Sequence, residues 1–91
     1  MDIYPGKIVY SIAGRDQGRY FIIIEKIDKN YVYIVDGDIR RLEKPKKKKI
    51  KHLRFIGKDA QHIIEKLEKG QKINNSDIRK SLKAFSNKFE T

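Results

Sequence analysis

The fold of this chain is decided by residues 8–35, IVYSIAGRDQGRYFIIIEKIDKNYVYIV. Three segments of this stretch, residues 8–11, 19–27 and 31–35, are rich in Ile, Val, Tyr and Phe, the side chains that pack well on a pleated sheet. Turn-forming residues follow the second and third segments, at 28–30 and 36–37. The pattern predicts an antiparallel meander of three short strands.

The loop between the first two predicted strands, residues 12–19 (IAGRDQGR), is called the glycine loop below. Gly14 and Gly18 lie four residues apart around a charged tip, as a sharp hairpin turn with positive φ requires. A phosphate-binding loop of the GxxxxGK[ST] type would precede a helix, whereas here the second glycine opens a strand. The spacing therefore indicates a turn and excludes that type of nucleotide site.

Further elements are expected after the meander. Residues 39–42 and 50–56 each have enough apolar residues to add a strand, with a lysine-rich stretch at their junction. Five short strands joined by tight turns favour a small barrel, because closure removes exposed sheet edges. The predicted fold class is mainly β with α: a small SH3-like barrel followed by a C-terminal helical hairpin.

The hairpin is predicted from a change of apolar period. Residues 59–69 and 76–89 carry apolar side chains at helical spacing, with Ser76 as the N-cap of the second helix and Gly70 ending the first. The two apolar stripes need a partner, which we expect to be the chain's own barrel and not another molecule. The stripes are Ala60, Ile63, Ile64 and Leu67, then Ile78, Leu82, Phe85 and Phe89.

Charge is distributed unevenly along the chain. Residues 40–54, called the basic run, hold nine lysines and arginines against one acid, Glu43, for a net charge of +8. Residues 1–39 carry a net −1 and residues 40–91 a net +11. A concentrated basic field binds a polyanion by releasing its condensed counterions. A solvated lysine stretch that only confers solubility is the alternative. We favour a nucleic-acid partner, because strand-like segments flank the basic run.

Composition narrows the classes of protein to which the chain could belong. The 91 residues are enough for one small domain, and the absence of cysteine excludes disulfides and thiolate metal sites and fits a cytoplasmic protein. The longest apolar stretch, residues 20–24, is too short to span a bilayer, so no membrane role is expected. His52 and His62 lie ten residues apart without metal-ligand spacing, and no catalytic constellation stands out. We therefore expect no enzyme activity, no cofactor, no metal and no small-molecule substrate.

The glycine loop and the strand after it carry a family resemblance. Residues 6–27 resemble a KOW motif, found in ribosomal proteins and in elongation factors of the NusG and Spt5 kind. With AGRDQGRYFIIIEKID, the following Asn30-Tyr31-Val32, Asp36-Gly37, the basic run and Lys51-His52-Leu53, residues 5–57 are similar to the fourteen-e family of large-subunit ribosomal proteins. Phe21 stands where most KOW motifs have a further glycine, which agrees with this family. Residues 58–91 are expected to lie outside the similarity.

The resemblance implies an SH3-like barrel over residues 1–57 that binds ribosomal RNA. The helical spacing adds residues 58–91 as a C-terminal extension packed on that barrel. It implies a ribosome-associated protein with RNA, and ribosomal proteins, as partners. A protein-interaction adaptor of the transcription or translation machinery is the alternative, because fold alone does not settle function. Lysines would contact phosphates, and arginines would contact phosphates or stack on bases. The expected RNA-binding residues are Arg15, Arg19, Arg40, Arg41, Lys44, Lys46, Lys47, Lys48, Lys49, Lys51, His52 and Arg54.

Overall fold

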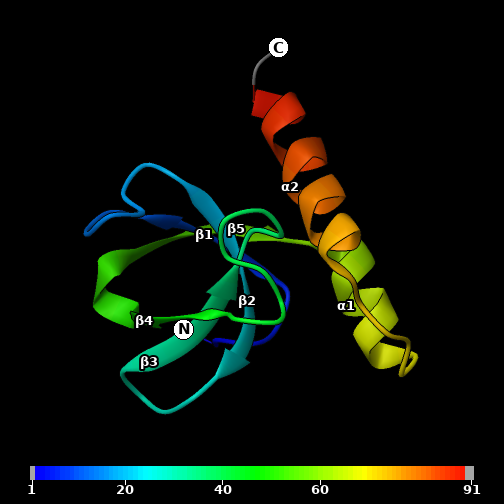
Figure 1. Ribbon diagram of the computed structural model, residues 1–91, viewed down its shortest axis with the longest axis horizontal. Helices are drawn as coiled ribbons and strands as arrows, with labels where there is room; N and C mark the ends of the chain where they lie inside the picture. The colour runs from blue at the N-terminus through cyan, green and yellow to red at the C-terminus, as the bar shows by residue number, and fades with distance from the viewer. Residues whose placement is uncertain (1, 90–91) are drawn as a thin grey trace.

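The computed structural model describes the backbone of residues 2–89 and the side chains of residues 2–85. A five-stranded sheet and two helices make up the fold (Figure 1), which confirms the prediction of a mainly β protein with α. The elements are β1 (Lys7–Ser11), β2 (Tyr20–Lys26), β3 (Tyr31–Val35), β4 (Lys46–Lys49), the 3₁₀ turn η1 (Ile50–His52), β5 (Leu53–Asp59), α1 (Gln61–Glu68) and α2 (Asn75–Phe89).

All neighbouring strands pair antiparallel, in the order β4-β3-β2-β1-β5. The first four strands form the meander, and β5 returns to pair with β1. In Figure 1 the sheet curls, and η1 joins the two edge strands directly. No ladder joins β4 to β5 within residues 2–89, so the sheet is open and closure into an SH3-like barrel is not confirmed.

The expected strand over residues 39–42 is wrong, because those residues lie in a long irregular loop, the Asp36 loop (residues 36–45). The Asp36 carboxylate accepts hydrogen bonds from the backbone N–H groups of Asp38 (2.9 Å) and Arg40 (2.8 Å), which holds this part of the chain in a turn. The lysine stretch expected at a junction is itself strand β4. The last strand starts later than expected, because Ile50–His52 forms η1.

One face of the sheet encloses an interior cluster of buried apolar side chains. Side chains of successive strand residues point to opposite faces, so the members of this cluster alternate along each strand with residues of the other face. The cluster consists of Val9, Phe21, Ile23, Val32, Ile34 and Leu53. This packing accounts for the apolar character of the segments that the sequence identified as strands.

The opposite face of β1 and β2 packs on the helices. Its cluster joins the strand residues Ile8, Ile22 and Val35 to Ala60, Ile63, Ile78 and Phe85 of the helical segment. Figure 1 shows α1 and α2 along one side of the sheet, away from β4. The strand β5 runs past residue 57, so the division into units 1–57 and 58–91 stays a prediction.

The ends of the helices differ in part from expectation. Gly70 (φ +68°) follows α1, where the Gln71 N–H bonds to the Lys66 carbonyl at 2.8 Å, the pattern of a glycine-terminated helix. Ser76 is not the N-cap of α2, because Asn74 takes that role with a 2.8 Å bond from the Asp77 N–H to its Oδ1.

For two side chains of the predicted stripes, burial is not confirmed. Leu67 of α1 is 43% exposed and lies outside the buried cluster. The predicted packing of Phe89 lies outside the described side chains. Within residues 2–89, neither helix has the length and apolar character needed to cross a membrane.

Candidate nucleic-acid interface

The predicted RNA-binding residues do not all lie in the same environment. Strand β4 forms one edge of the sheet, with the Asp36 loop before it and η1 after it, and Arg54 at the end of the basic run lies in β5 at the other edge. Exposed members are Arg15, Arg19, Arg41, Lys44, Lys47, Lys49, Lys51 and Arg54. Half-buried members are Arg40, Lys46 and His52, and one member, Lys48, is buried.

Lys48 departs from its expected role. The side chain is only 7% exposed, and its ammonium group donates a 2.7 Å hydrogen bond to the carbonyl of Ala13 in the glycine loop. Strand alternation explains the difference, because Lys48 pairs with the buried Val32 and shares its face. Lys48 therefore fixes the glycine loop to β4 and does not present its charge to a phosphate. We leave it out of the interface.

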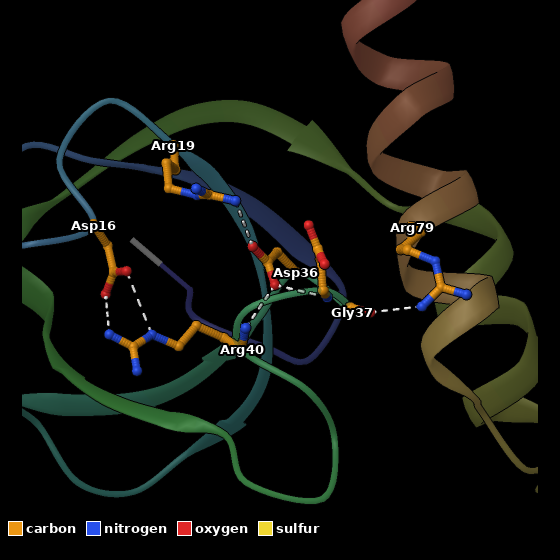
Figure 2. Close-up of polar contacts among 7 residues, drawn as sticks. Asp16, Arg19, Asp36, Gly37, Arg40 and Arg79 are labelled. Atoms are coloured by element: carbon orange, nitrogen blue, oxygen red, sulfur yellow. Dashed lines mark hydrogen bonds and ion pairs between the residues drawn. The ribbon is translucent and has the colours of Figure 1, made fainter.

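Two of the predicted arginines are engaged by acids. The Arg40 guanidinium contacts both carboxylate oxygens of the buried Asp16, with Nε–Oδ1 at 3.4 Å and Nη2–Oδ2 at 3.1 Å (Figure 2). Arg19 Nη2 lies 3.3 Å from Asp36 Oδ2, although the Arg19 side chain stays 42% exposed. The Arg40 guanidinium is thus held in an ion pair inside the protein, whereas part of the Arg19 side chain remains exposed to solvent.

These ion pairs belong to a network that reaches α2. Arg79 Nη1 donates a 2.7 Å hydrogen bond to the carbonyl of Gly37, as Figure 2 shows. The side-chain oxygen of Asn75 accepts the N–H of Leu42 at 2.8 Å. The glycine loop, the Asp36 loop and α2 are therefore held together, which positions Arg41 and Lys44. The sequence showed the Asp36-Gly37 turn, but nothing in its pattern identified Asp16 or Arg79 as partners.

Glu43 is the one acid of the basic run. Its carboxylate accepts a hydrogen bond from the Asn75 side-chain amide and lies 3.2 Å from Arg41 Nε. The hydrogen bond from Asn75, followed by that from Arg41, lowers the pKa of Glu43. Glu43 therefore remains ionised at neutral pH and offsets part of the Arg41 charge.

Two basic hollows flank β4, and neither is lined by a carboxylate. The larger has a volume of about 550 Å³ and the smaller about 450 Å³. Lys29 of the β2–β3 turn lines the smaller one, and sequence reasoning had not included it. The larger is lined by Ile39, Arg40, Arg41, Lys44, Pro45, Lys46 and Lys47, and the smaller by Lys29, Asn30, Tyr31, Lys49, Ile50 and Lys51.

The histidines have structural surroundings. The backbone carbonyl of His52 accepts the N–H of Ile12 at 3.0 Å, which holds η1 against the glycine loop. His62 Nε2 lies 3.6 Å from Asp77 at the helix pair. Within the part of the chain that the structure describes, no three metal-ligating side chains come together.

Basic side chains gather along the β4 edge of an open antiparallel sheet, a charge distribution that favours association with polyanions. No family model matches the chain. It is 30% identical over 82 residues to the large ribosomal subunit protein eL14 of Methanococcus vannielii, a match that covers 90% of this chain and 91% of that protein. The chain belongs to the eL14 family of large ribosomal subunit proteins.

The family resemblance expected from the glycine loop is thereby confirmed. Its expected extent is wrong, because a match over 90% of the chain includes most of residues 58–91. The buried face that the helices share with β1 and β2 ties them to the same fold.

Proposed function

We propose that this protein binds ribosomal RNA as a non-enzymatic component of the large ribosomal subunit in the cytoplasm. The row of exposed basic side chains along β4 and its flanks carries the proposal, and membership of the eL14 family supports it. In this proposal the sheet is an SH3-like barrel that is incompletely closed between β4 and β5. Residues 1–57 supply the RNA contacts, residues 58–91 support the sheet, and neighbouring ribosomal proteins are further partners.

The proposed RNA-contacting residues fall into two groups. Lys44, Lys47, Lys49 and Lys51 are exposed point charges that would bind phosphates without reading the sequence. Lys46 is half-buried at the same edge. The exposed arginines have planar guanidinium groups that suit bidentate phosphate contacts or stacking on unpaired bases. They are Arg15, Arg19, Arg41 and Arg54.

The proposal is tested with two variants of equal net charge. The triple variant K47Q/K49Q/K51Q removes charge from the proposed interface, whereas K58Q/K69Q/K72Q removes the same charge from exposed lysines beyond it. Fluorescence anisotropy with a labelled fragment of large-subunit ribosomal RNA, measured across a range of salt, gives the slope of log affinity against log salt. We expect the first triple to reduce the slope by about 2–3 units, since each phosphate contact contributes about 0.7–0.9.

The matched control should keep nearly the wild-type slope. Equal losses for the two triples would show that net charge alone governs binding and would reject the proposed surface. Sedimentation of the tagged protein with ribosomal subunits tests the location: comigration with the large subunit is expected at low salt, and sedimentation free of ribosomes would reject the ribosomal assignment.

A further inference from the structure

The outward face of β3 and β4 carries an aromatic and basic patch. Tyr31 and Tyr33 alternate with the buried Val32 and Ile34, so both tyrosines point away from the interior cluster. The ladder places Lys49 opposite Tyr31 and Lys47 opposite Tyr33, and paired residues share a face. Tyr31, Tyr33, Lys47 and Lys49 therefore form one surface, called the outer patch.

The helices leave this patch uncovered. They pack on the same side of the sheet further along, where Ile8, Ile22 and Val35 are buried against them. Figure 1 shows α1 and α2 lying away from β4 and from the start of β3. Both tyrosines of the outer patch are half-buried, while Lys47 and Lys49 are exposed. A concentration of aromatic rings among lysines at an uncovered sheet surface is typical of single-strand nucleic-acid binding.

The other strand tyrosines contrast with this pair. The Tyr20 ring lies 5.1 Å from the Phe85 ring and 5.0 Å from the Tyr10 ring, measured between centroids. Tyr20 also packs against the helix-side cluster. Tyr20 is therefore occupied in packing between the sheet and α2, with Tyr10 against its ring, and the tyrosines of β3 remain as the candidates for an external ligand.

The surroundings of Tyr31 suit a nucleotide. Lys47 Nζ lies 4.6 Å from the centroid of the Tyr31 ring, so one face of the ring already has a cation against it. The hollow of about 450 Å³ lies beside this ring, with Lys29, Lys49 and Lys51 in its lining. On the other side of the patch, the exposed Glu25 of β2 stands opposite Tyr33. The charge pattern therefore directs a bound phosphate toward β4.

We propose that the outer patch is a stacking site for unpaired nucleobases of RNA. A base lies against Tyr31 or Tyr33, and the adjoining phosphates lie between the ammonium groups of Lys29, Lys49 and Lys51. Lys47 moves from the Tyr31 ring to a phosphate when the base arrives. This inference rests on the proposed RNA binding and adds a second kind of contact, to the flat face of a base.

The test separates a flat ring from apolar bulk. The variant Y31L/Y33L removes both rings, whereas Y31F/Y33F keeps them and serves as the matched control. Binding is measured by anisotropy with a labelled single-stranded RNA of ten nucleotides, and by competition with a polyphosphate chain that has no bases. Far-ultraviolet circular dichroism verifies the fold of each variant.

We expect Y31L/Y33L to bind the RNA roughly tenfold more weakly, with unchanged affinity for polyphosphate, because base stacking on aromatic side chains is lost. Y31F/Y33F should bind both probes like the wild type. Equal RNA affinity of the leucine and phenylalanine variants would overturn the stacking site while leaving salt-dependent RNA binding intact. A wild-type protein that binds neither probe would instead overturn the proposed function itself.

A second experiment needs no variant. Ultraviolet irradiation of the wild-type complex with the same RNA, followed by mass spectrometry of the tryptic peptides, locates bases that lie against protein side chains. Crosslinks at Tyr31 or Tyr33 are expected. Crosslinks confined to the glycine loop or the helices would place the bases elsewhere and overturn the inference.

Discussion

Asp77 shows how one carboxylate can hold the start of a helix. It accepts the N–H of Asn74 (3.1 Å) while its own N–H bonds to Asn74 Oδ1, a reciprocal capping arrangement, and Lys66 Nζ lies 3.0 Å from its Oδ2. The hydrogen bond from the Asn74 backbone, then that from Lys66, lowers the pKa of Asp77. A lowered native pKa contributes stability that is present above the unfolded value and lost as acid protonates the group.

The variant D77N should therefore unfold more easily than the wild type at pH 7 and lose less stability on acidification. The stability that Asp77 contributes is lost below about pH 4, because the Asp77 carboxyl of the unfolded chain binds a proton there. Urea unfolding midpoints at pH 7 and pH 2.5 measure it. D38N, at an exposed site, is the control and should keep the wild-type difference between the two midpoints. An unchanged acid response of D77N would contradict the argument.

Arg40 and Arg41 are adjacent and should respond differently to the same substitution. R40Q leaves the Asp16 carboxylate buried without its guanidinium partner, which we expect to cost about 1–3 kcal/mol of unfolding free energy. R41Q breaks only an exposed pair with Glu43, so stability should change by less than about 0.5 kcal/mol while RNA affinity falls. Urea unfolding and anisotropy distinguish the two, and equal effects on stability would refute the assignment.

The sequence could identify the basic residues, but not which of them form ion pairs or hydrogen bonds within the protein. The two arginines are consecutive in the sequence, and the difference arises because the Asp36 loop turns Arg40 toward Asp16, which is 24 positions earlier in the chain. Lys48 was indistinguishable from the other lysines until strand pairing showed which face it occupies. Such roles depend on long-range contacts, which local patterns do not contain.

At the scale of elements, the contact between the Asp36 loop and α2 is close enough to require a glycine. Gly37 has φ +77°, and a Cβ there would lie 2.5 Å from the backbone carbonyl oxygen of Asn75. Gly57 has a similar φ of +69° but no atom within 4 Å of the corresponding position. The two glycines therefore separate the cost of the backbone conformation from the cost of the contact.

We expect G57A to cost about 1 kcal/mol, from the left-handed conformation alone. G37A should cost roughly 1–3 kcal/mol more, because the loop must move away from the start of α2. Hydrogen exchange should then be faster at the amides of the Asp36 loop in G37A than in G57A. Equal unfolding free energies for the two variants would show that α2 does not hold the loop.

Elements with a strong apolar pattern were the predictable ones. The strands β1, β2 and β3 and both helices follow from alternation and helical spacing, because burial imposes those periods. Strand β4 was missed, since four lysines have no apolar alternation and pair with β3 only as an edge. The segment 39–42 was misassigned because side-chain bonds to Asp36 outweigh its local strand preference.

For the whole molecule, the sheet and the helices share one buried face. Removing residues 61–91 would expose Ile8, Ile22 and Val35, which are buried against them. We expect residues 1–60 alone to lack a cooperative thermal transition and to bind an apolar dye, and we expect added peptide 61–91 to restore the transition. Calorimetry and circular dichroism measure this, and a truncated chain with the wild-type Tm would contradict it.

The open edge at β4 also has a consequence for the protein before it meets any partner. An unpaired strand edge is a template on which a second copy can add its own strand and start an aggregate. On β4 such a copy would bring its own lysines against Lys47 and Lys49, and the like charges repel it. We therefore expect the edge that RNA is proposed to cover to resist pairing between copies of the protein, and high salt or lysine acetylation should weaken this protection.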